Sequence, residues 1–304
     1  MKIHQDWTAA GFSLTPVAHA IGPFGYQGFL SAVWNIWNDD EIELSIAESA
    51  SALIPLTVSK GTLRFVGHRD LVDYRSPLGR GADELMRDVV DSLPAGMGIH
   101  LDSLPEEAVA PLVDGLRMLG LEVTPVVHHT AAVLTLPATF DDYLMSIAKK
   151  ERHELRRKRR RYETEVGSLE LCRATGDGEV FDRFVELHRR SEGEKGSFMS
   201  DHMERYFRML IDLPGWEIDA LLTDSGDMTA AAFGFADDDG YFLYNSAFNP
   251  DLRHLSPGQV MLGALIERAI AEQRTVFDFL KGDEPYKFRF GAVERPLYEI
   301  VTAR

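Results

Sequence analysis

Residues 255–260, with the sequence Leu-Ser-Pro-Gly-Gln-Val, decide the fold expected for the second half of the chain. Ser256 is suited to the N-cap of a helix, Pro257 to its first helical position, and Gln259 can close a capping box. Gly258 has no side chain, so the first-turn N–H groups would be open to an anion that the helix dipole also favours. These residues alone fit a phosphate cradle and a well-capped structural helix equally well.

The segments around this helix predict an antiparallel meander before it and a strand after it. Short runs that suit strands are separated by turns rich in Asp, Ser, Gly and Asn. A polar segment and a final strand complete the pattern. We expect strands at 168–173, 216–223, 228–236, 241–248, 275–280 and 296–302, helices at 179–190, 201–211 and 257–273, and polar segments at 191–200 and 281–291.

The charge of the chain is unevenly distributed. The chain has 32 basic and 48 acidic residues and a formal net charge of -16. Nine of the basic residues lie in residues 149–161, where only Glu151 and Glu154 oppose them, so this segment carries +7 and the remainder -23. The overall acidity argues against a general nucleic-acid binder. The basic segment fits either a solvated helix face or a site for an anionic ligand.

One continuous helix is expected to carry this segment. Thr139 is a suitable N-cap, Asp142 occupies the third helical position, and acidic residues in the first turn suit the helix dipole. His153 shares a face with basic residues, whose positive charges favour the neutral form of its imidazole. These residues are Lys149, Arg156, Arg157 and Arg160.

The first half of the chain is predicted to be mixed α and β without a catalytic motif. We expect strands at 43–47, 52–58, 63–67, 97–101 and 132–136, and helices at 83–93 and 106–119. Residues 73–77, which include Tyr74, form a polar loop that either lines a site or is an ordinary surface turn.

Length and composition narrow the class of protein. The 304 residues suggest two domains or one large one. The single cysteine, Cys172, excludes an intramolecular disulfide framework and a cysteine-rich zinc site, and it fits a reducing compartment. The first residues lack the apolar core of a signal peptide, and no run approaches 18 apolar residues. We therefore expect a cytoplasmic protein without a membrane span or a metal.

Three stretches, taken in order, resemble a known family. Residues 149–158 read Lys-Lys-Glu-Arg-His-Glu-Leu-Arg-Arg-Lys, residues 255–259 read Leu-Ser-Pro-Gly-Gln, and residues 277–289 read Phe-Asp-Phe-Leu-Lys-Gly-Asp-Glu-Pro-Tyr-Lys-Phe-Arg. The pattern resembles the GNAT acyltransferases, and within them the CelD-like (cellulose-biosynthesis-type) acetyltransferases, which are related to the FemABX transferases. The resemblance covers about residues 138–295. Lys281 stands where this branch usually has Arg, and the usual aromatic residue is absent near residues 191–194.

The resemblance implies an α+β fold of two tandem GNAT-like domains, each a mostly antiparallel mixed sheet flanked by helices. The first, degenerate domain would span residues 1–137 and the second, acyltransferase domain residues 138–304. The implied activity is transfer of an acyl group from acyl-CoA, acetyl-CoA or longer, to an amine or hydroxyl acceptor by direct attack on the thioester.

The resemblance and the residue types together give candidate site residues. Catalytic candidates are His153, Asp278 or Asp283 as the base and Tyr286 as the acid for the thiolate. Candidates for contact with the donor are Tyr244, Asn245, Ser246, Arg253, Ser256, Pro257, Gly258, Gln259 and Val260. Candidates for contact with the acceptor are Tyr74, Arg156, Arg157, Lys281, Glu284 and Lys287. The sequence does not decide which group is the base.

Two alternatives stay open beside the acyl-CoA hypothesis. The basic helix would also suit a FemABX-like transferase that takes its acyl group from aminoacyl-tRNA, because many cations suit an RNA backbone. A degenerate GNAT-like protein that binds CoA without catalysis is the other. The expected acceptor is a small molecule, or a lipid or sugar amine, and the net acidity argues against a nucleic-acid partner.

Overall fold

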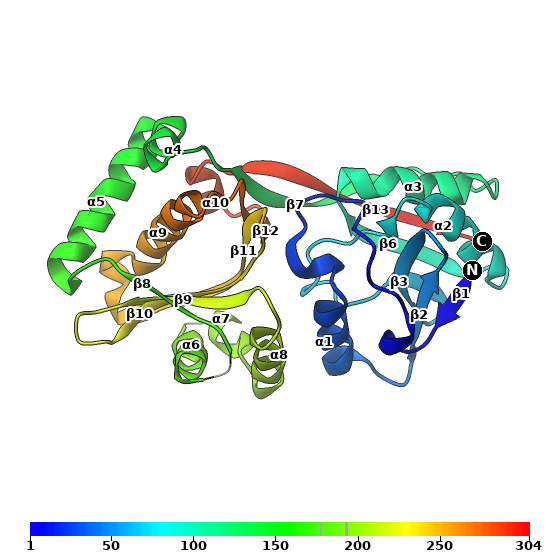
Figure 1. Cartoon of the computed structure of the whole chain (residues 1–304), viewed down its shortest axis with the longest axis horizontal. Coiled ribbons are helices and arrows are strands. Elements are labelled where there is room, and N and C mark those ends of the chain that lie inside the picture. The colour runs from blue at the N-terminus through cyan, green and yellow to red at the C-terminus, as the bar shows by residue number, and fades with distance from the viewer. Residues whose placement is uncertain (177, 192–193) are drawn as a thin grey trace. The chain divides into compact units, whose positions relative to one another are not determined.

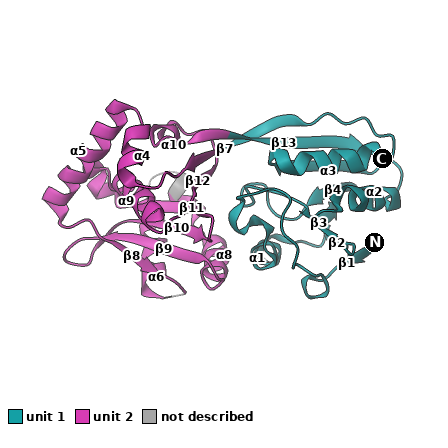
Figure 2. Ribbon diagram, turned by 45° about the horizontal axis from the view of Figure 1, so that its top comes forward, with its two compact units in different colours: residues 1–131, 295–304 teal, residues 132–294 magenta. Residues whose placement is uncertain are grey.

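A computed structural model describes residues 1–176, 178–191 and 194–304 (Figure 1). The chain divides into two compact units (Figure 2). Unit 1 comprises Met1–Ala131 and Arg295–Arg304, and unit 2 comprises Ala132–Glu294. Two strands, β7 (Val126–Thr135) and β13 (Val293–Ala303), contribute residues to both units. Unit 2 is thus one uninterrupted segment, whereas unit 1 is built from two.

Unit 1 contains a mixed sheet whose strand order is β1-β2-β3-β4-β6-β13. Neighbouring strands run antiparallel, except that β4 and β6 are parallel. The strands predicted near residues 43, 52, 63 and 97 are confirmed. Their bounds are β1 (Lys2–His4), β2 (Ile42–Glu48), β3 (Ala52–Ser59), β4 (Thr62–Phe65) and β6 (Gly98–Leu104), with the short β5 (Leu78–Gly79) paired to β3.

Three α-helices accompany this sheet. The predicted helices are α2 (Ala82–Ser92) and α3 (Glu106–Arg117), which pack against each other. Helix α1 (Gln27–Trp37) was not predicted, because it begins without a capping side chain at Tyr26 and has no charged residue that would mark a polar face. Two short 3-10 helices, η1 (Trp7–Ala9) and η2 (Gly22–Gly25), precede α1.

The strands of unit 2 belong to the same 13-stranded sheet and follow in the order β7-β12-β11-β10-β9-β8. The predicted meander is confirmed, since β9, β10 and β11 pair antiparallel in succession, whereas β11 and β12 run parallel. The strands are β8 (Leu171–Ala174), β9 (Trp216–Leu222), β10 (Met228–Ala236), β11 (Gly240–Phe248) and β12 (Val276–Lys281).

Helices cover both faces of the unit 2 sheet (Figure 1). On one face α9 (Pro257–Ala271) packs its apolar residues onto a core that includes Tyr241, Phe277 and Phe279. The other face holds α6 (Glu179–Arg189) and α8 (Asp201–Ile211), with α7 (Glu194–Phe198) between them in the chain. Within the polar segment predicted at 191–200, residues 192–193 lie outside the described residues. This mixed α/β architecture confirms the predicted fold class.

The continuous helix expected from Thr139 onward is wrong. The chain forms α4 (Phe140–Ser146) and α5 (Lys149–Val166), separated by extended backbone at Ile147 and Ala148. Ile147 is buried in the core at this break, and a straight helix would not place it there. The predicted cap is confirmed, because Thr139 Oγ1 accepts a hydrogen bond from Asp142 N at 3.1 Å. No helix in the described part of the chain is long and apolar enough to cross a membrane.

We predict that Gly115→Ala destabilises unit 1, although alanine is the better helix former. A β-carbon at Gly115 of α3 would lie 2.4 Å from the carbonyl oxygen of Asp83 on α2 and 2.9 Å from Met86 Cβ. Overpacking of this kind costs about 1–3 kcal/mol, more than the gain in helix propensity of about 1 kcal/mol. Urea denaturation would measure the loss. Ala110→Gly, at an exposed position of α3, is the control, because it changes helix propensity without changing the packing. A Gly115→Ala variant that is more stable than the wild type would contradict the prediction.

Candidate functional site

The central parallel strands of unit 2 pair over three residues and then part. The pairs are Gly240↔Val276, Tyr241↔Phe277 and Phe242↔Asp278. Beyond them β11 continues to Phe248 and β12 to Lys281, and among the described strands β11 pairs from Leu243 onward with β10 alone. We call the unpaired backbone edges of residues 243–248 and 279–281 the β11–β12 opening. On the β11 side, backbone N–H and C=O groups that face the opening are free of the ladder and can meet a ligand.

A β-bulge lies on the β11 side of the opening. Asn245 pairs with Phe233 and Leu243 with Gly234, so Tyr244 is an extra residue on β11. A bulge interrupts the hydrogen-bond ladder and redirects side chains. The predicted donor contacts Tyr244, Asn245 and Ser246 therefore lie where the backbone leaves the regular strand pattern.

The bulge turns two consecutive side chains of β11 toward α6 and α8. The Tyr244 hydroxyl lies 2.9 Å from that of Tyr206 on α8, and its ring packs 5.2 Å from the ring of Trp216. Asn245 Oδ1 lies 2.9 Å from Nε2 of the buried His188 on α6. An amide oxygen can only accept, so His188 donates from Nε2. His188 and Tyr206, which the sequence analysis missed, fix the conformation of the bulge.

The start of α9 differs from the predicted capping box. Ser256 is in the left-handed region at φ 55°, and its side chain makes no cap hydrogen bond. Its carbonyl oxygen instead accepts from Gln259 N and Val260 N at 3.0 and 3.1 Å. Pro257 has no N–H, so Gly258 supplies the only first-turn N–H without a protein acceptor in the described part of the chain. The predicted capping by Ser256 and Gln259 is wrong, because the left-handed turn through η3 (Pro250–Leu255) redirects the hydroxyl.

The Gln259 side chain is used by the basic helix. Lys158 of α5 donates to Gln259 Oε1, so an ammonium group lies beside the N-terminus of α9. Lys158, Gln259 and Tyr286 line a small cavity of about 40 Å³ between α5, α9 and α10 (Pro285–Arg289). Arg253, predicted as a further cation, lies exposed in η3. The ammonium of Lys158 therefore places positive charge beside the first turn of α9.

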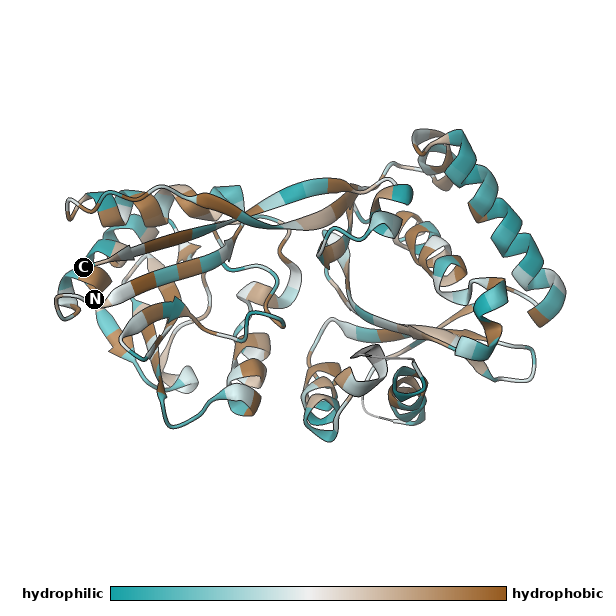
Figure 3. Ribbon diagram, turned by 180° about the vertical axis from the view of Figure 1, so that it is seen from behind, coloured by the Kyte–Doolittle hydropathy of each residue, from teal (hydrophilic) through white to brown (hydrophobic). Residues whose placement is uncertain are grey.

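Helix α5 is hydrophilic along its length (Figure 3). It extends past the basic segment to Val166, so Glu163 and Glu165 join it and its net charge is +5, from nine basic and four acidic residues. Three arginines, at 157, 159 and 161, pair with glutamates on the same helix. Lys149, His153, Arg156 and Arg160 form an exposed stripe without such partners in the described residues.

The end of β12 is kinked by a local hydrogen bond. Asp278 is fully buried, and its Oδ1 accepts from Leu280 N at 2.7 Å. Leu280 has a φ of 62°, outside the strand region. The carboxylate predicted as a candidate base therefore stabilises the turn where β12 leaves the sheet.

Lys287 holds the same turn from the other side. Its side chain is 4% exposed, and Nζ donates to the carbonyl oxygens of Leu280, Lys281 and Gly282 at 3.3, 2.8 and 3.3 Å. It also lies 2.8 Å from Glu284 Oε2. Gly282 has a φ of 119°, and a β-carbon there would lie 2.9 Å from Nζ, so only glycine fits. The ammonium predicted to meet the acceptor or to face solvent is instead buried in contacts with its own chain.

Three further predicted residues follow this turn. Asp283 and Glu284 are exposed, and the Lys287 contact lowers the pKa of Glu284 against the opposing effect of burial. Tyr286 is partly buried, and burial followed by the charge of Glu284 raises its pKa to about 12. Its hydroxyl is therefore protonated at neutral pH, although the raised pKa makes it a weaker acid than an exposed tyrosine.

Several predicted site residues do not gather at the opening. His153 is exposed on α5 and lines neither of the cavities beside that helix, whereas Arg156 lines one of about 260 Å³ between α4, α5 and α9. Arg157 is paired with Glu154. Tyr74 is fully buried in unit 1 under the Arg295 guanidinium. Across residues 1–176, 178–191 and 194–304, no three His, Cys, Asp or Glu side chains form a metal-binding group.

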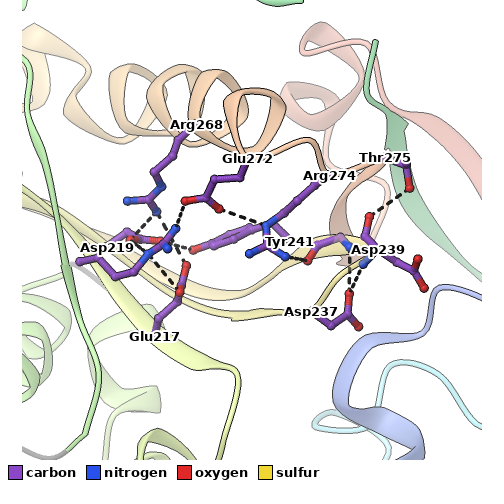
Figure 4. A network of polar contacts seen from close by, with 11 residues as sticks. Glu217, Asp219, Asp237, Asp239, Tyr241, Arg268, Glu272, Arg274 and Thr275 are labelled. Atoms are coloured by element: carbon purple, nitrogen blue, oxygen red, sulfur yellow. Dashed lines mark hydrogen bonds and ion pairs between the residues drawn. The ribbon is translucent and has the colours of Figure 1, made fainter. Parts of the chain in front are cut away.

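A buried charge network, missed in the sequence, lies between β9 and α9 (Figure 4). Glu217 and Asp219 alternate on β9 and so point to the same face of the sheet. Asp219 contacts Arg268 of α9 and accepts from the Tyr241 hydroxyl at 2.9 Å. Glu217 lies 3.1 Å from Arg173 of β8. The polar residues could be seen in the sequence, but their pairing depends on the strand register.

This network holds α9 on the sheet at the paired start of β11. Arg173 also contacts Glu272 at 2.7 Å, which in turn meets Arg274. Burial, and then the charge of Asp219, raise the pKa of Glu217 to about 7, against the lowering by Arg173 and Arg268. Two carboxylates thus share a dry site with two guanidinium groups.

The segment that contains the opening matches a known domain. Residues 149–288 match the model of the acetyltransferase (GNAT) domain. This stretch runs from the start of α5 into α10 and includes β11, β12 and α9. No curated protein matches the chain in sequence.

Solved structures with the same fold cover nearly the whole chain at low identity. FemX has a TM-score of 0.63 and 11% identity, over 98% of this chain and 97% of that one. L-PGS from Bacillus licheniformis has a TM-score of 0.59 and 12% identity, over 89% and 86%. A conserved protein of unknown function from Bacteroides thetaiotaomicron has a TM-score of 0.65 and 12% identity, over 99% of each chain. These likenesses concern the fold, and they extend over both units.

We predict that Lys287→Met lowers the free energy of unfolding by about 1–3 kcal/mol, because three carbonyl oxygens and a carboxylate lose their donor. Methionine keeps much of the length of the side chain but none of the hydrogen bonds. Chemical denaturation would measure the loss. Arg289→Met, at an exposed position of α10, is the control, and equal stability of the two variants would disprove the role of Lys287.

We predict a pH-dependent effect of Glu217→Gln. In the wild type, burial raises the pKa of Glu217 to about 7 in the folded state, whereas in the unfolded state the carboxyl has its ordinary pKa of 4.5. Stability contributed by this group is therefore present below pH 4.5 and lost as the pH rises to about 7. The free energy of unfolding of the variant, relative to that of the wild type, should rise by on the order of 1–3 kcal/mol between pH 4.5 and 7. Above pH 7 this difference should stay constant. Denaturation across this range would show it, and a pH-independent difference would refute it.

Proposed function

We propose that unit 2 is an acyl-CoA-dependent acyltransferase that transfers its acyl group directly to an amine or hydroxyl. The observation that carries the proposal is the β11–β12 opening beside the N-terminus of α9, within a segment that matches the acetyltransferase (GNAT) domain. An acyl-CoA has a pyrophosphate and an arm with two amides, which suit a helix start and an unpaired strand edge respectively.

The donor would be held by its phosphates and by its amides. Gly258 N–H, the dipole of α9 and the ammonium of Lys158 would receive the pyrophosphate. The backbone at Tyr244, Asn245 and Ser246 would pair with the arm and meet the thioester carbonyl. Because this backbone is fixed by the bulge, it would stabilise the oxyanion without reorganising.

The proposed chemistry moves two protons. The acceptor amine or hydroxyl loses a proton as it attacks the thioester carbon, and the C–S bond breaks to release a thiolate. Tyr286, protonated at neutral pH, would supply the proton to that thiolate. Asp283 is the better placed of the proposed bases, since it is exposed just after β12, whereas Asp278 is engaged with Leu280 N.

A second candidate donor is aminoacyl-tRNA, which the exposed stripe Lys149, His153, Arg156 and Arg160 on α5 favours. The stripe presents three permanent cations, fewer than the nine basic residues of the segment, because five of the others contact the protein. Binding of charged tRNA would weaken steeply with salt through counterion release. Binding of tRNA with no affinity for any acyl-CoA would replace the first proposal by this one.

We predict that Ser256→Asp with Gly258→Asp abolishes acyl-CoA binding, because carboxylates would face the phosphates. Aspartate tolerates the left-handed conformation of Ser256, and a β-carbon at Gly258 meets only Phe248 at 3.4 Å, so the variant should fold. Calorimetry with acetyl-CoA and longer acyl-CoAs would give a loss of about 100-fold or more, roughly 3 kcal/mol.

The matched control is Ser256→Asn with Gly258→Asn, which has the same shape without the charge and should lose much less affinity. Equal losses in the two variants would show that size, not charge, is responsible, and would contradict the phosphate site. Affinity for acyl-CoA without turnover over a broad panel of acceptors would instead favour a non-catalytic CoA-binding protein.

A further inference from the structure

Unit 1 contains a cavity that the proposed acyl transfer does not use. It has a volume of about 330 Å³ and lies between α1 and the face of β2, β3, β4 and β6. We call it the unit 1 pocket. Its volume falls within the range of small-molecule sites, which is about 300–1,000 Å³.

One wall of the unit 1 pocket is aromatic and apolar. Trp34 and Trp37 come from successive turns of α1 and are partly exposed, and Val33, Ile42 and Phe65 continue the wall. The Trp37 ring lies 6.2 Å from the ring of His68, which also lines the pocket. Indole rings offer flat apolar area to a planar ligand at low entropic cost.

The opposite wall contains a desolvated cation. Arg75 is 5% exposed, and its guanidinium contacts Asp102 and donates to the carbonyl oxygen of Gly67 at 2.7 Å. Its Nε has no hydrogen-bond partner in the described residues. Burial, followed by the charge of nearby Arg64, lowers the pKa of Arg75 to about 10. The positive charge of Arg64 therefore lies near that of Arg75, and this part of the pocket favours an anion.

Arg64 is the accessible member of this pair. Its Nη1 lies 2.5 Å from His100 Nδ1. Because guanidinium only donates, Nδ1 accepts and the proton of His100 lies on Nε2, 3.1 Å from Glu299 Oε2. Arg64 thus contacts a neutral imidazole rather than a carboxylate. A further lining cation, Arg69, lies 3.5 Å from Asp70 and is already paired.

We propose that the unit 1 pocket binds a small aromatic organic anion, with its ring against Trp34 and Trp37 and its anionic group at Arg64. Three features support this class of ligand. They are the size of the cavity, the two indole rings, and Arg64, which has no carboxylate partner among the described residues. The anionic group is a carboxylate or a phosphate ester, which both present negatively charged oxygens to Arg64.

Calorimetry on the full chain tests the proposal with three matched probes: 2-naphthoate, 2-naphthyl phosphate and the neutral 2-naphthamide. Binding of either anion with a Kd below about 1 mM, and at least about tenfold more tightly than the amide, is expected. The tighter of the two anions identifies the anionic group. No binding of either anion, or equal binding of the amide, would overturn the proposal.

Three variants test whether the anion binds in the unit 1 pocket. Arg64→Gln should weaken the anion at least about tenfold, the typical effect of losing a charge-assisted hydrogen bond. Arg80→Gln, an exposed arginine of unit 1 outside the pocket, should leave it unchanged. Trp34→Leu tests the aromatic wall independently and should weaken both anions. Unchanged affinity in Arg64→Gln and Trp34→Leu would place binding elsewhere and overturn the proposal, whereas acyl-CoA binding should be the same in all three variants.

Discussion

The parting of β11 and β12 after three pairs is the constraint on which the candidate active site depends. Continued pairing would use the backbone groups of residues 243–248 within the sheet. Two devices keep the strands apart. On β11 the bulge at Tyr244 breaks the register, and on β12 the ammonium of Lys287 occupies the carbonyl oxygens of the last residues. Neither edge has the regular strand geometry that would let the hydrogen-bond ladder between β11 and β12 continue.

The position of α9 follows from a second, electrostatic constraint. Its apolar face packs on the sheet, and Arg268 fixes it laterally by contacting Asp219 in the buried network. Removing one partner from such a network leaves a buried charge uncompensated. The free-energy cost of this is far larger than the stability that the intact network contributes. The helix therefore has one register on the sheet, and its first turn is held beside the end of β11. The buried charges near the C-terminal end of α9 thus fix the position of its N-terminal turn.

The sequence predicted the fold well and the site in part. Helices with a clear apolar period, such as α2 and α3, and the meander were found, because these signals are local. The left-handed Ser256, the break at Ile147 and the buried Lys287 were not, because each depends on contacts far along the chain. The unit 1 pocket joins α1 to several strands, and no spacing in the sequence links Trp34 to Arg64. Motifs give the residue types of a site, but the register decides which of them meet.

Residues 295–303 complete unit 1 by pairing β13 with β6, whereas unit 2 ends at Glu294. On the ribosome, every residue of unit 2 is made before the strand that finishes unit 1. The nascent chain must therefore keep the edge of β6 unpaired while the later unit is synthesised and folds, and an unpaired edge is open to misassociation. In evolution the same arrangement is an advantage. Because one uninterrupted segment encodes unit 2, that unit can be exchanged as a whole.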